Sequence, residues 1–346
     1  MQNTKILLSI VDLKKYFPLR KKSIFQKERP YLRANDEINL DIYEGETFGL
    51  VGESGCGKST FGRTLLQLQK PTQGHVTYFG CGEGVDLTRL KGEKMRALRK
   101  DLQIIFQDPY SSLDPRMTVG QLIEEGLATH RFFKKGSAEM RQYVLKMMEA
   151  CGLRADMLHR YPHQFSGGQR QRISIARSLA VKPKFVVCDE CVSALDVSVQ
   201  SQILNLLSDL KRQEGLTYLF ISHDLSVVRY ISDRIGVMYL GRIVEQGAAN
   251  EVFDNPRHPY TIALISAIPT LTEKKEGKIL LEGHMPSPVS PPKGCPFHTR
   301  CFMAEEKCQR IPAPIVEVEA GHFVACHFAA TSTEEKRRIA VNNEKK

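Results

Sequence analysis

The sequence predicts an α/β fold built on an open, mostly parallel sheet, and three observations carry this prediction. A glycine-rich motif follows the apolar run at residues 48–51 and precedes a segment with helical character. A second apolar run, residues 185–188, ends in two carboxylates, as buried parallel strands do where such sheets bind ligands. Between them, "TVGQLIEEGLATH" and "SAEMRQYVLKMMEACGL" carry apolar residues at helical spacing, which indicates a helical insert.

Length and composition set the broad class of the protein. The chain has 346 residues, of which 42% are apolar and 25% charged, as expected for a globular protein of two or three compact units. No apolar run approaches the roughly 18–20 residues of a membrane span, and the first residues lack a cleavable signal pattern. We therefore expect a soluble, intracellular chain. The net charge of +10 is dispersed, so we expect no nucleic-acid partner.

The glycine-rich motif predicts a phosphate-binding loop. In "LVGESGCGKST" the pattern G-x-x-x-x-G-K-[ST] stands between a predicted strand and a predicted helix. This context distinguishes the motif from a glycine-rich turn that arises by chance. Glycines let backbone N–H groups converge on phosphate oxygens, and the helix start adds positive potential. We expect Lys58 to reach the outer phosphates and the Ser59 hydroxyl to bind Mg²⁺. The expected contacts to nucleotide and Mg²⁺ are Gly52, Glu53, Ser54, Gly55, Cys56, Gly57, Lys58, Ser59 and Thr60.

The second apolar run predicts the carboxylates of a hydrolytic site. In "KFVVCDECVSALD" the strand ends in Asp189 and Glu190, at the sheet edge that binds ligands. Asp189 would hold Mg²⁺, directly or through water, and Glu190 would be the general base that orients water against the γ-phosphate. An acidic pair after a strand is usually only a turn, but after a phosphate loop it indicates hydrolysis.

Three further polar residues stand at the ends of predicted elements. Gln107 ends "LQIIFQDP", His223 ends "TYLFISHD" and Asp196 closes "SALD". Each residue alone is typical of a surface turn. All three in this order, together with the phosphate loop and the carboxylates, indicate one site.

A second glycine-rich element, "QFSGGQRQR", predicts another helix start, with Ser166 as its N-cap. Such a start also attracts anions. Together, "GESGCGKST", "IIFQDP", "FSGGQRQR", "FVVCDE", "SALD" and "FISHD" resemble the ATP-binding subunits of ABC transporters, in that family's order, across about residues 5–255. The resemblance implies a P-loop NTPase core of the ABC type, with ATP and Mg²⁺ as cofactors.

The resemblance also explains the second glycine-rich element. In this family two ATPase domains meet head to tail, and each offers its signature helix to the ATP of the other. The residues expected to contact the partner's ATP are Ser166, Gly167, Gly168 and Gln169. Phe165 and Cys191 replace the Leu and Pro of many members, and neither position touches phosphate.

Further roles follow from the same resemblance. Gln107 would link the metal and the attacking water to the interface with a membrane partner, and His223 would contact the γ-phosphate. Asp196 would organise the dimer interface. The aromatic residue that stacks on adenine is Phe17, in the pattern L-x-K-x-F, or Tyr31.

The predicted parts follow one another along the chain. The core includes an antiparallel β subdomain in which "GHVTYFG" alternates like a strand, a helix that ends near Gly215, and a hairpin that turns at Gly241. The predicted boundaries are 1–107 for the first part of the core, 108–165 for the helical subdomain, 166–254 for the second part of the core, 255–330 for a C-terminal extension and 331–346 for a disordered tail.

The extension contains a Pro-rich linker and then four cysteines, separated by five, six and seventeen residues. In a reduced compartment such thiols indicate metal binding rather than disulfides. Four thiolates can hold Zn²⁺ or a [4Fe–4S] cluster, but this spacing matches neither the zinc-ribbon nor the ferredoxin pattern. The candidate ligands are Cys295, Cys301, Cys308 and Cys326, and His298, His322 and His327 could join a zinc site.

The segment "RHPYTIALISAIP", the linker and the cysteines resemble the C-terminal extension of oligopeptide/dipeptide importer ATPases. That resemblance implies a [4Fe–4S] cluster on the four cysteines, with Zn²⁺ as the alternative, and a structural role. "FSGGQRQRISIARSL" and "IFQDPYSSLDPRMTVG" are similar to the second, F-type subunit.

The resemblance implies a complete transport machine. We expect a heterodimer with a sister ATPase, two integral-membrane permeases and an extracytoplasmic substrate-binding protein. The chain would lie on the cytoplasmic face of the inner membrane and energise uptake of oligopeptides or dipeptides, with nickel or another small solute as alternative cargo. A soluble regulatory ATPase with a redox-sensing or structural metal centre is a second hypothesis. A nucleotide-binding scaffold is a third, and Glu190 and His223 speak against it.

Overall fold

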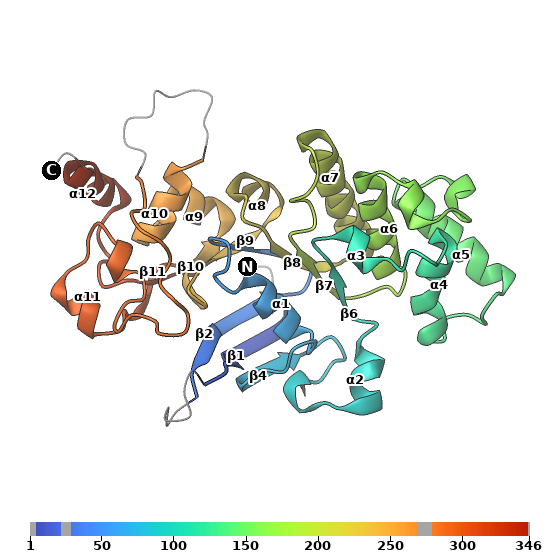
Figure 1. The fold of residues 1–346 in the computed structure, drawn as a ribbon, viewed down its shortest axis with the longest axis horizontal. Helices are drawn as coiled ribbons and strands as arrows, with labels where there is room; N and C mark the ends of the chain where they lie inside the picture. Colours follow the sequence, from blue (N-terminus) through green and yellow to red (C-terminus); the bar gives the residue numbers. More distant parts are fainter. Residues whose placement is uncertain (1–4, 22–28, 269–278, 345–346) are drawn as a thin grey trace. The chain divides into compact units, whose positions relative to one another are not determined.

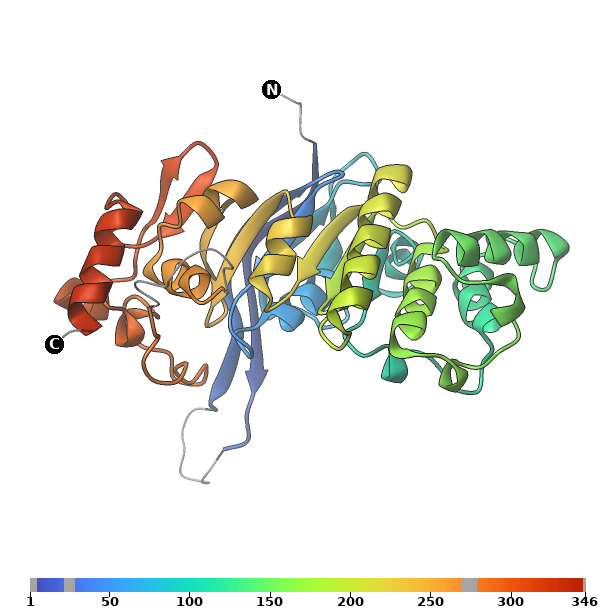
Figure 2. The same cartoon turned by 90° about the horizontal axis from the view of Figure 1, so that it is seen from above.

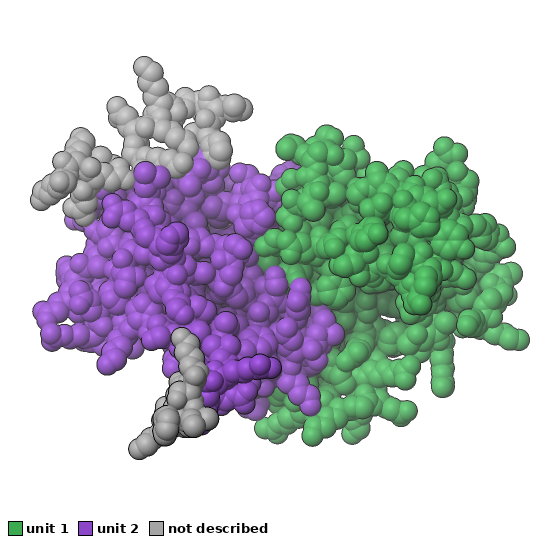
Figure 3. Space-filling view, viewed as in Figure 1, with its two compact units in different colours: residues 1–8, 41–47, 77–221 green, residues 9–40, 48–76, 222–346 purple. Residues whose placement is uncertain are grey.

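The structure is a computed structural model that describes residues 5–21, 29–268 and 279–344, with side chains up to residue 340. The chain forms two compact units (Figure 3). Unit 1 comprises Met1–Leu8, Asp41–Thr47 and Thr77–Ile221, and unit 2 comprises Ser9–Leu40, Phe48–Val76 and Ser222–Lys346. No helix in the described ranges is both long and apolar enough to cross a membrane.

The parallel strands of unit 1 confirm the prediction of a buried α/β sheet. The strands β6 (Leu102–Ile105), β7 (Phe185–Asp189) and β8 (Thr217–Ile221) lie in the order β8-β7-β6 and pair in parallel. Every residue of β7 and β8 is buried. Strands that are covered on both faces are apolar along their whole length. The sequences of β7 and β8 therefore do not alternate between apolar and polar residues.

The predicted helical insert is present in unit 1. The helices α4 and α5 both pack on α6 (Figures 1 and 2). Thr118 begins α4 with a capping box, and Ser137 caps α5, so each start satisfies an otherwise unpaired backbone N–H. The helices here are α3 (Pro109–Ser112), α4 (Val119–Thr129), α5 (Ala138–Ala150), α6 (Gly167–Leu179) and α7 (Val197–Glu214), with 3₁₀ turns at Ala155–Met157 and Pro162–Gln164.

Two short helical stretches precede β6. A 3₁₀ turn covers Leu87–Arg89, and helix α2 covers Gly92–Leu98. Gly92 has φ +57°, a conformation that glycine adopts without strain. Ahead of this segment the short strand β5 (Val85–Asp86) pairs antiparallel with the end of β4 (Gln73–Tyr78).

Unit 2 contains the strand that leads into the phosphate loop. The order in its main sheet is β11-β12-β10-β9-β3, with β3 and β9 parallel and the other pairs antiparallel. Gly241 turns the predicted hairpin between β9 and β10 at φ +80°. The strands are β3 (Thr47–Val51), β9 (Arg234–Tyr239), β10 (Arg242–Ala248), β11 (Ile315–Glu319) and β12 (His322–Ala325).

A second sheet carries the antiparallel subdomain, in which β2 (Tyr31–Tyr43), β1 (Ile6–Pro18) and β4 are neighbours in that order. Unit 2 also contains six helices among the described residues. They are α1 (Lys58–Leu65), α8 (Leu225–Ile231), α9 (Ala249–Asp254), α10 (Pro259–Ser266), α11 (Glu306–Arg310) and α12 (Thr333–Glu344), with a 3₁₀ turn at His298–Arg300.

The end of the chain differs from the sequence prediction. The prediction for 331–346 is a disordered tail, whereas Thr333–Glu344 form helix α12, and residues 345–346 lie outside the described ranges. The Lys336 side chain is fully buried and donates a hydrogen bond to the Arg257 carbonyl. Ala340 packs in an apolar cluster with Ile262. These tertiary contacts hold a segment whose composition alone favours disorder.

Candidate nucleotide site

The phosphate loop leaves the end of β3 and enters α1 with little room for side chains. Gly52 has φ +152°, and a Cβ placed there would lie 2.2 Å from the Met238 carbonyl oxygen. Gly57 has φ +112°, and its Cβ would lie 2.1 Å from the Ala34 carbonyl oxygen. Both the backbone conformation and the close packing therefore require glycine.

Lys58 points back into the loop. Its side chain is buried, and Nζ donates hydrogen bonds to the carbonyl oxygens of Gly52 (2.6 Å) and Glu53 (3.1 Å). Among the described residues no side chain caps α1, and its first turn contains no acidic residue. A helix start with N–H groups available, beside a fixed ammonium, has the charge and geometry to hold phosphate.

Neighbouring backbone and side chains fix the shape of the loop. Asn35 Nδ2 donates to the Gly57 carbonyl (3.1 Å), and the Gly241 N–H donates to the Cys56 carbonyl (2.8 Å). Burial raises the pKa of the Cys56 thiol, which fills space under the loop as a neutral group.

Glu53 makes two contacts that the sequence analysis missed. Its N–H donates to the Tyr260 hydroxyl (2.8 Å), and its carboxylate pairs with Arg300 Nη1 (2.9 Å). These partners lie 207 and 247 residues further along the chain. No local pattern in the sequence could have indicated them.

The two aromatic candidates for adenine lie on the strands of the antiparallel subdomain. Phe17, near the end of β1, is half-buried, and Lys15 Nζ lies 4.7 Å from its ring centroid. Tyr31 begins β2 and is 46% exposed. Stacking of either ring on adenine stays a prediction.

In unit 1 the carboxylates stand at the end of β7, as predicted. Asp189 is buried as the last residue of the strand. Glu190 has φ +48°, its N–H donates to the Ile221 carbonyl (3.0 Å), and its Oε2 accepts a hydrogen bond from Gln107 Nε2 (2.9 Å). The structure therefore brings the predicted base and the predicted water-orienting amide together.

The signature segment forms an exposed helix start, as predicted. Ser166 is the N-cap of α6, and its Oγ accepts from the Gln169 N–H (3.4 Å) while Gln169 Oε1 accepts from the Ser166 N–H (3.1 Å). Ser166 and Gly167 are exposed, and a Cβ on Gly168 would lie 2.5 Å from Val199 Cγ1. The small side chains of residues 166–168 thus leave the helix start accessible and allow Gly168 to pack closely against Val199.

The other two predicted polar residues also stand near helix starts. Asp196 caps α7 by accepting from the Val199 N–H (3.0 Å) and the Ser198 hydroxyl (2.8 Å). These hydrogen bonds lower the pKa of Asp196. His223, in unit 2, is exposed and directly precedes Asp224, the N-cap of α8.

The cysteines of the extension are buried or half-buried thiols. Burial raises the pKa of Cys295 to about 11 and that of Cys301 to about 12, and the neighbouring thiols, Cys308 and Cys326 among them, add to both shifts. Across residues 5–21, 29–268 and 279–344 no group of three or more His, Cys, Asp or Glu side chains is arranged to hold a metal ion. The expected [4Fe–4S] or Zn²⁺ centre therefore lacks support in this structure.

The three histidines near these cysteines are also engaged elsewhere. His322 Nε2 pairs with Glu245 Oε1 (2.8 Å), His327 Nε2 lies 3.0 Å from the Ile311 carbonyl, and His298 Nδ1 lies 2.8 Å from the Cys295 carbonyl. Each has a protein partner at one ring nitrogen.

Comparison with known proteins places this geometry in a family. Residues 35–193 match the family described as ABC transporter, and residues 244–308 match the oligopeptide/dipeptide transporter C-terminal region. Among solved structures, a dimeric ATP-binding cassette in a post-hydrolysis state with ADP and Pi shares 27% identity at a TM-score of 0.62, covering 70% of this chain and 99% of that chain. Another cassette, from Clostridium perfringens, shares 27% identity at a TM-score of 0.60, covering 72% of this chain and 91% of that chain.

Similarity to curated proteins extends over nearly the whole chain. The oligopeptide transport ATP-binding protein OppF of Escherichia coli is 50% identical over 329 residues, 94% of this chain and 97% of that protein. AppF of Bacillus subtilis, also an oligopeptide transport ATP-binding protein, is 47% identical over 330 residues, 94% of this chain and 98% of its own length. The chain therefore belongs to the ABC transporter ATP-binding proteins, in the group of the oligopeptide and dipeptide transport ATP-binding proteins.

Proposed function

We propose that this chain is the ATP-hydrolysing subunit of an importer for oligopeptides or dipeptides. The phosphate loop, with the Lys58 ammonium held inside it by two carbonyls, is the observation that carries the ATPase assignment. The cargo follows from the relatives, whose names give oligopeptide and dipeptide transport. Members of this family are ATPases coupled to transport.

The loop would bind ATP and Mg²⁺ through residues 52–60. In this proposal Lys58 leaves its carbonyl partners and reaches the β- and γ-phosphates, while the Ser59 hydroxyl and Asp189 serve Mg²⁺. Phe17 or Tyr31 stacks on adenine. The start of α1, where the N-cap Gly57 makes no side-chain cap and the first turn has no acidic residue, supports the phosphate assignment.

Hydrolysis would depend on the residues that follow the parallel strands. Glu190 orients the attacking water as general base, Gln107 holds Glu190 and that water, and His223 contacts the γ-phosphate. The hydrogen bond between Gln107 and Glu190 supports this assignment, because it fixes the carboxylate that must accept the proton.

The second half of the site would come from another ATPase. We assign residues 166–169 to the ATP of a sister subunit, and Asp196 to the interface of that heterodimer. The exposed start of α6 supports this assignment. The dimeric state of a similar cassette with ADP and Pi gives a precedent for two cassettes around nucleotide.

The membrane partners complete the proposal. The chain would sit peripherally on the cytoplasmic face of the inner membrane, with two permeases and an extracytoplasmic substrate-binding protein. The test is purification of the tagged chain from detergent-solubilised membranes, together with uptake of labelled peptide by the same cells. We expect both permeases in the eluate, and loss of uptake on Lys58→Ala. Recovery of no permease would overturn the assignment to a transporter. Loss of nickel uptake in place of peptide uptake would overturn the assignment of the cargo.

A metal centre in the extension is a separate and finer proposal. Neighbouring thiols help to raise the pKa of Cys295, Cys301 and Cys326, and this proximity supports ligation of a [4Fe–4S] cluster, or of Zn²⁺, by Cys295, Cys301, Cys308 and Cys326. The arrangement of the described side chains does not support it. Iron and zinc analysis after anaerobic purification decides between the metals, and finding neither removes this part of the proposal.

A further inference from the structure

We propose that Arg300 and Tyr260 are positioning residues that hold the phosphate loop through Glu53, which makes the C-terminal extension a working part of the ATP site. This inference rests on the proposed assignment of residues 52–60 to the phosphates. It adds two residues from outside the nucleotide-binding motifs to the set that shapes that loop.

Glu53 is fixed at three of its groups. Its N–H donates to the Tyr260 hydroxyl (2.8 Å), its carbonyl accepts from Lys58 Nζ (3.1 Å), and its carboxylate pairs with Arg300 Nη1 (2.9 Å). Glu53, whose carbonyl contacts Lys58, is therefore itself held by two residues of the C-terminal extension. A change at Tyr260 or Arg300 moves the carbonyl that Lys58 contacts.

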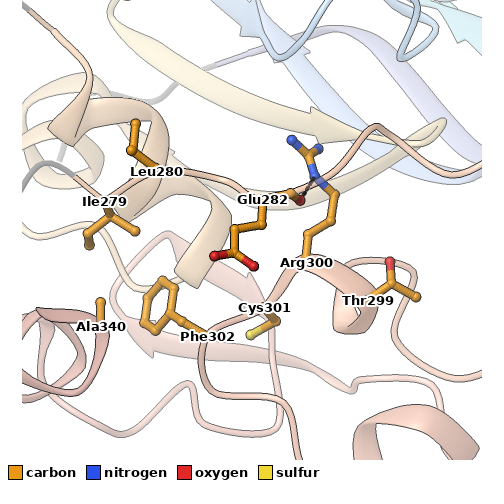
Figure 4. A pocket seen from close by; sticks show the side chains of 8 residues that line it. All are labelled: Ile279, Leu280, Glu282, Thr299, Arg300, Cys301, Phe302 and Ala340. Carbon is orange, nitrogen blue, oxygen red and sulfur yellow. Dashed lines mark hydrogen bonds between the residues drawn. The ribbon is translucent and has the colours of Figure 1, made fainter. Parts of the chain in front are cut away.

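The ion pair is largely withdrawn from water. The Arg300 side chain is only 7% exposed and that of Glu53 is 28% exposed. Arg300 Nε also donates to the Glu282 carbonyl (3.3 Å, Figure 4). Burial by itself would lower the pKa of Arg300, but the interactions with Glu53, and with Tyr239 beside it, outweigh burial and raise the pKa. A guanidinium in this position needs the carboxylate, because an unpaired buried charge is strongly unfavourable.

Tyr260 has no freedom to place its hydroxyl elsewhere. Its ring is fully buried, 4.8 Å from the ring centroid of Tyr239 and 5.4 Å from that of Phe297. Phe297 belongs to the extension and also packs on Tyr239 at 5.2 Å. The aromatic cluster thus joins strand β9 to two parts of the extension, helix α10 and Phe297, as a support for the loop.

Arg300 and the next residue face different parts of unit 2. In Figure 4 the guanidinium of Arg300 turns toward the Glu282 backbone, whereas the Cys301 side chain lies on the side of Phe302. Arg300, Cys301 and Phe302 line the same pocket, and the Arg300 guanidinium reaches from it to the Glu53 carboxylate.

A positioning role predicts a specific kinetic pattern. The loop and its support belong to unit 2, whereas Gln107 and Glu190 belong to unit 1. Loosening Glu53 should weaken binding of ATP in the ground state and the transition state alike, which raises KM and leaves kcat nearly unchanged. A residue that only stabilises the fold would change neither constant for the folded fraction.

The test compares Arg300→Met, Arg300→Lys, Glu53→Gln, Tyr260→Phe and the double variant Arg300→Met/Glu53→Gln in the full chain with its sister ATPase. ATP affinity is measured with a fluorescent analogue, and KM and kcat from phosphate release. We expect Arg300→Met to raise KM for ATP by about tenfold, as loss of a charged hydrogen bond does, with kcat within about twofold. Arg300→Lys should recover part of the loss. The double variant should be no weaker than the single ones, because the two residues act as a pair.

A matched control comes from another ion pair of the same unit. Arg257 Nη2 and Glu319 Oε1 are 2.9 Å apart, with the arginine side chain 16% exposed. Arg257→Met and Glu319→Gln should lower the unfolding midpoint and leave KM for ATP unchanged.

Two results separate failure of this inference from failure of the proposed function. If Arg300→Met and Glu53→Gln leave KM and ATP affinity unchanged while Lys58→Ala abolishes binding, the positioning role is wrong and the phosphate loop stands. If Lys58→Ala also leaves ATP affinity unchanged, the assignment of residues 52–60 is wrong. A KM increase of equal size in the Arg257 and Glu319 variants would likewise refute a specific role for Arg300.

Discussion

Glu190 occupies a backbone conformation that residues with a Cβ rarely adopt. Its φ of +48° belongs to the left-handed region, and holding a non-glycine residue in a sparsely populated region costs about 1–3 kcal/mol. The N–H bond to the Ile221 carbonyl and the bond from the Ser193 N–H to the Glu190 carbonyl keep it there. Backbone strain at the end of a buried strand, on a carboxylate that Gln107 contacts, agrees with a role as general base.

Glu190→Gln tests that role directly. An amide cannot accept the proton, so we expect kcat for ATP hydrolysis to fall by about 100-fold or more, the usual contribution of a general base. ATP affinity should change little, because the phosphate loop is untouched. Phosphate release and nucleotide binding measure the two quantities. Glu149→Gln, on the exposed side of α5, is the control and should hydrolyse normally; an equal rate in both variants would remove Glu190 from the mechanism.

Gly57→Ala tests the steric argument for the loop. Both Gly57 (φ +112°) and Gly82 (φ +98°) have backbones that alanine disfavours, by about 1–2 kcal/mol for left-handed conformations. Only Gly57 would also place its Cβ against a backbone oxygen, at 2.1 Å, whereas nothing lies within 4 Å at Gly82. Gly57→Ala should lose ATP binding. In urea unfolding it should also lower the free energy of unfolding by more than Gly82→Ala does. Equal losses at the two sites would contradict the packing argument.

Single residues differ in how far the sequence reveals them. Lys58, Ser166 and Glu190 lie inside short contiguous motifs, so spacing alone predicts their element and their place in it. Arg300 and Tyr260 touch Glu53 only because the fold brings distant segments together. A contact across 247 residues leaves no periodicity in the chain, and a sequence pattern cannot predict it.

At the scale of elements, the extension is continuous with the sheet of unit 2. Strand β12 pairs with β10, with Glu245 opposite Val324. Glu245 is buried and accepts hydrogen bonds from the N–H groups of Arg257 (2.7 Å) and His258 (2.8 Å), and it pairs with His322 (2.8 Å). The change of composition at Asn255 predicts a new segment. The composition does not predict that this segment prolongs the sheet, because the pairing partners are far apart in sequence.

His258 makes the stability of this region depend on pH. It is the N-cap of α10, its Nδ1 accepts from the Tyr260 N–H (3.1 Å), and burial, with a smaller contribution from Lys336, lowers its pKa to about 3. Between that value and the ordinary 6.5 the unfolded chain binds a proton that the folded chain does not. The free energy of unfolding should therefore fall as pH falls from about 6 to 4, by about 1.4 kcal/mol per pH unit from this group.

His258→Asn checks this pH dependence. Asparagine also caps helices but does not titrate, so the variant should lose overall stability from the space it leaves and show a shallower decline with falling pH. Urea unfolding of the full chain at several pH values between 6 and 4 measures both effects. A decline as steep as in the parent chain would show that His258 does not titrate as its burial requires.

At the scale of the whole molecule, the exposed start of α6 is a surface that a second chain could contact. Ser166 and Gly167 are exposed at the end of a thirteen-residue helix that has no acidic residue in its first turn. Such a start attracts anions. If a sister ATPase presents its bound ATP there, the nucleotide joins the two chains, and hydrolysis lets them separate.

A negative charge at the start of α6 should therefore prevent ATP-dependent pairing. In the proposed dimer, Ser166→Glu would place a carboxylate against the γ-phosphate of the partner's ATP, so we expect this variant and its sister ATPase to remain monomeric at saturating ATP. The measurement uses chains that also carry Glu190→Gln, which should block ATP cleavage. With Ser166 unchanged, such a chain and its sister ATPase should form a stable dimer, as seen by sedimentation velocity. Ser137→Glu is the matched control, because Ser137 caps α5 in the same way, with Oγ accepting from the Met140 N–H (3.2 Å). It loses an equivalent cap and should still dimerise. Dimers of Ser166→Glu as stable as those of the control would mean that the signature helix does not contact nucleotide across the interface.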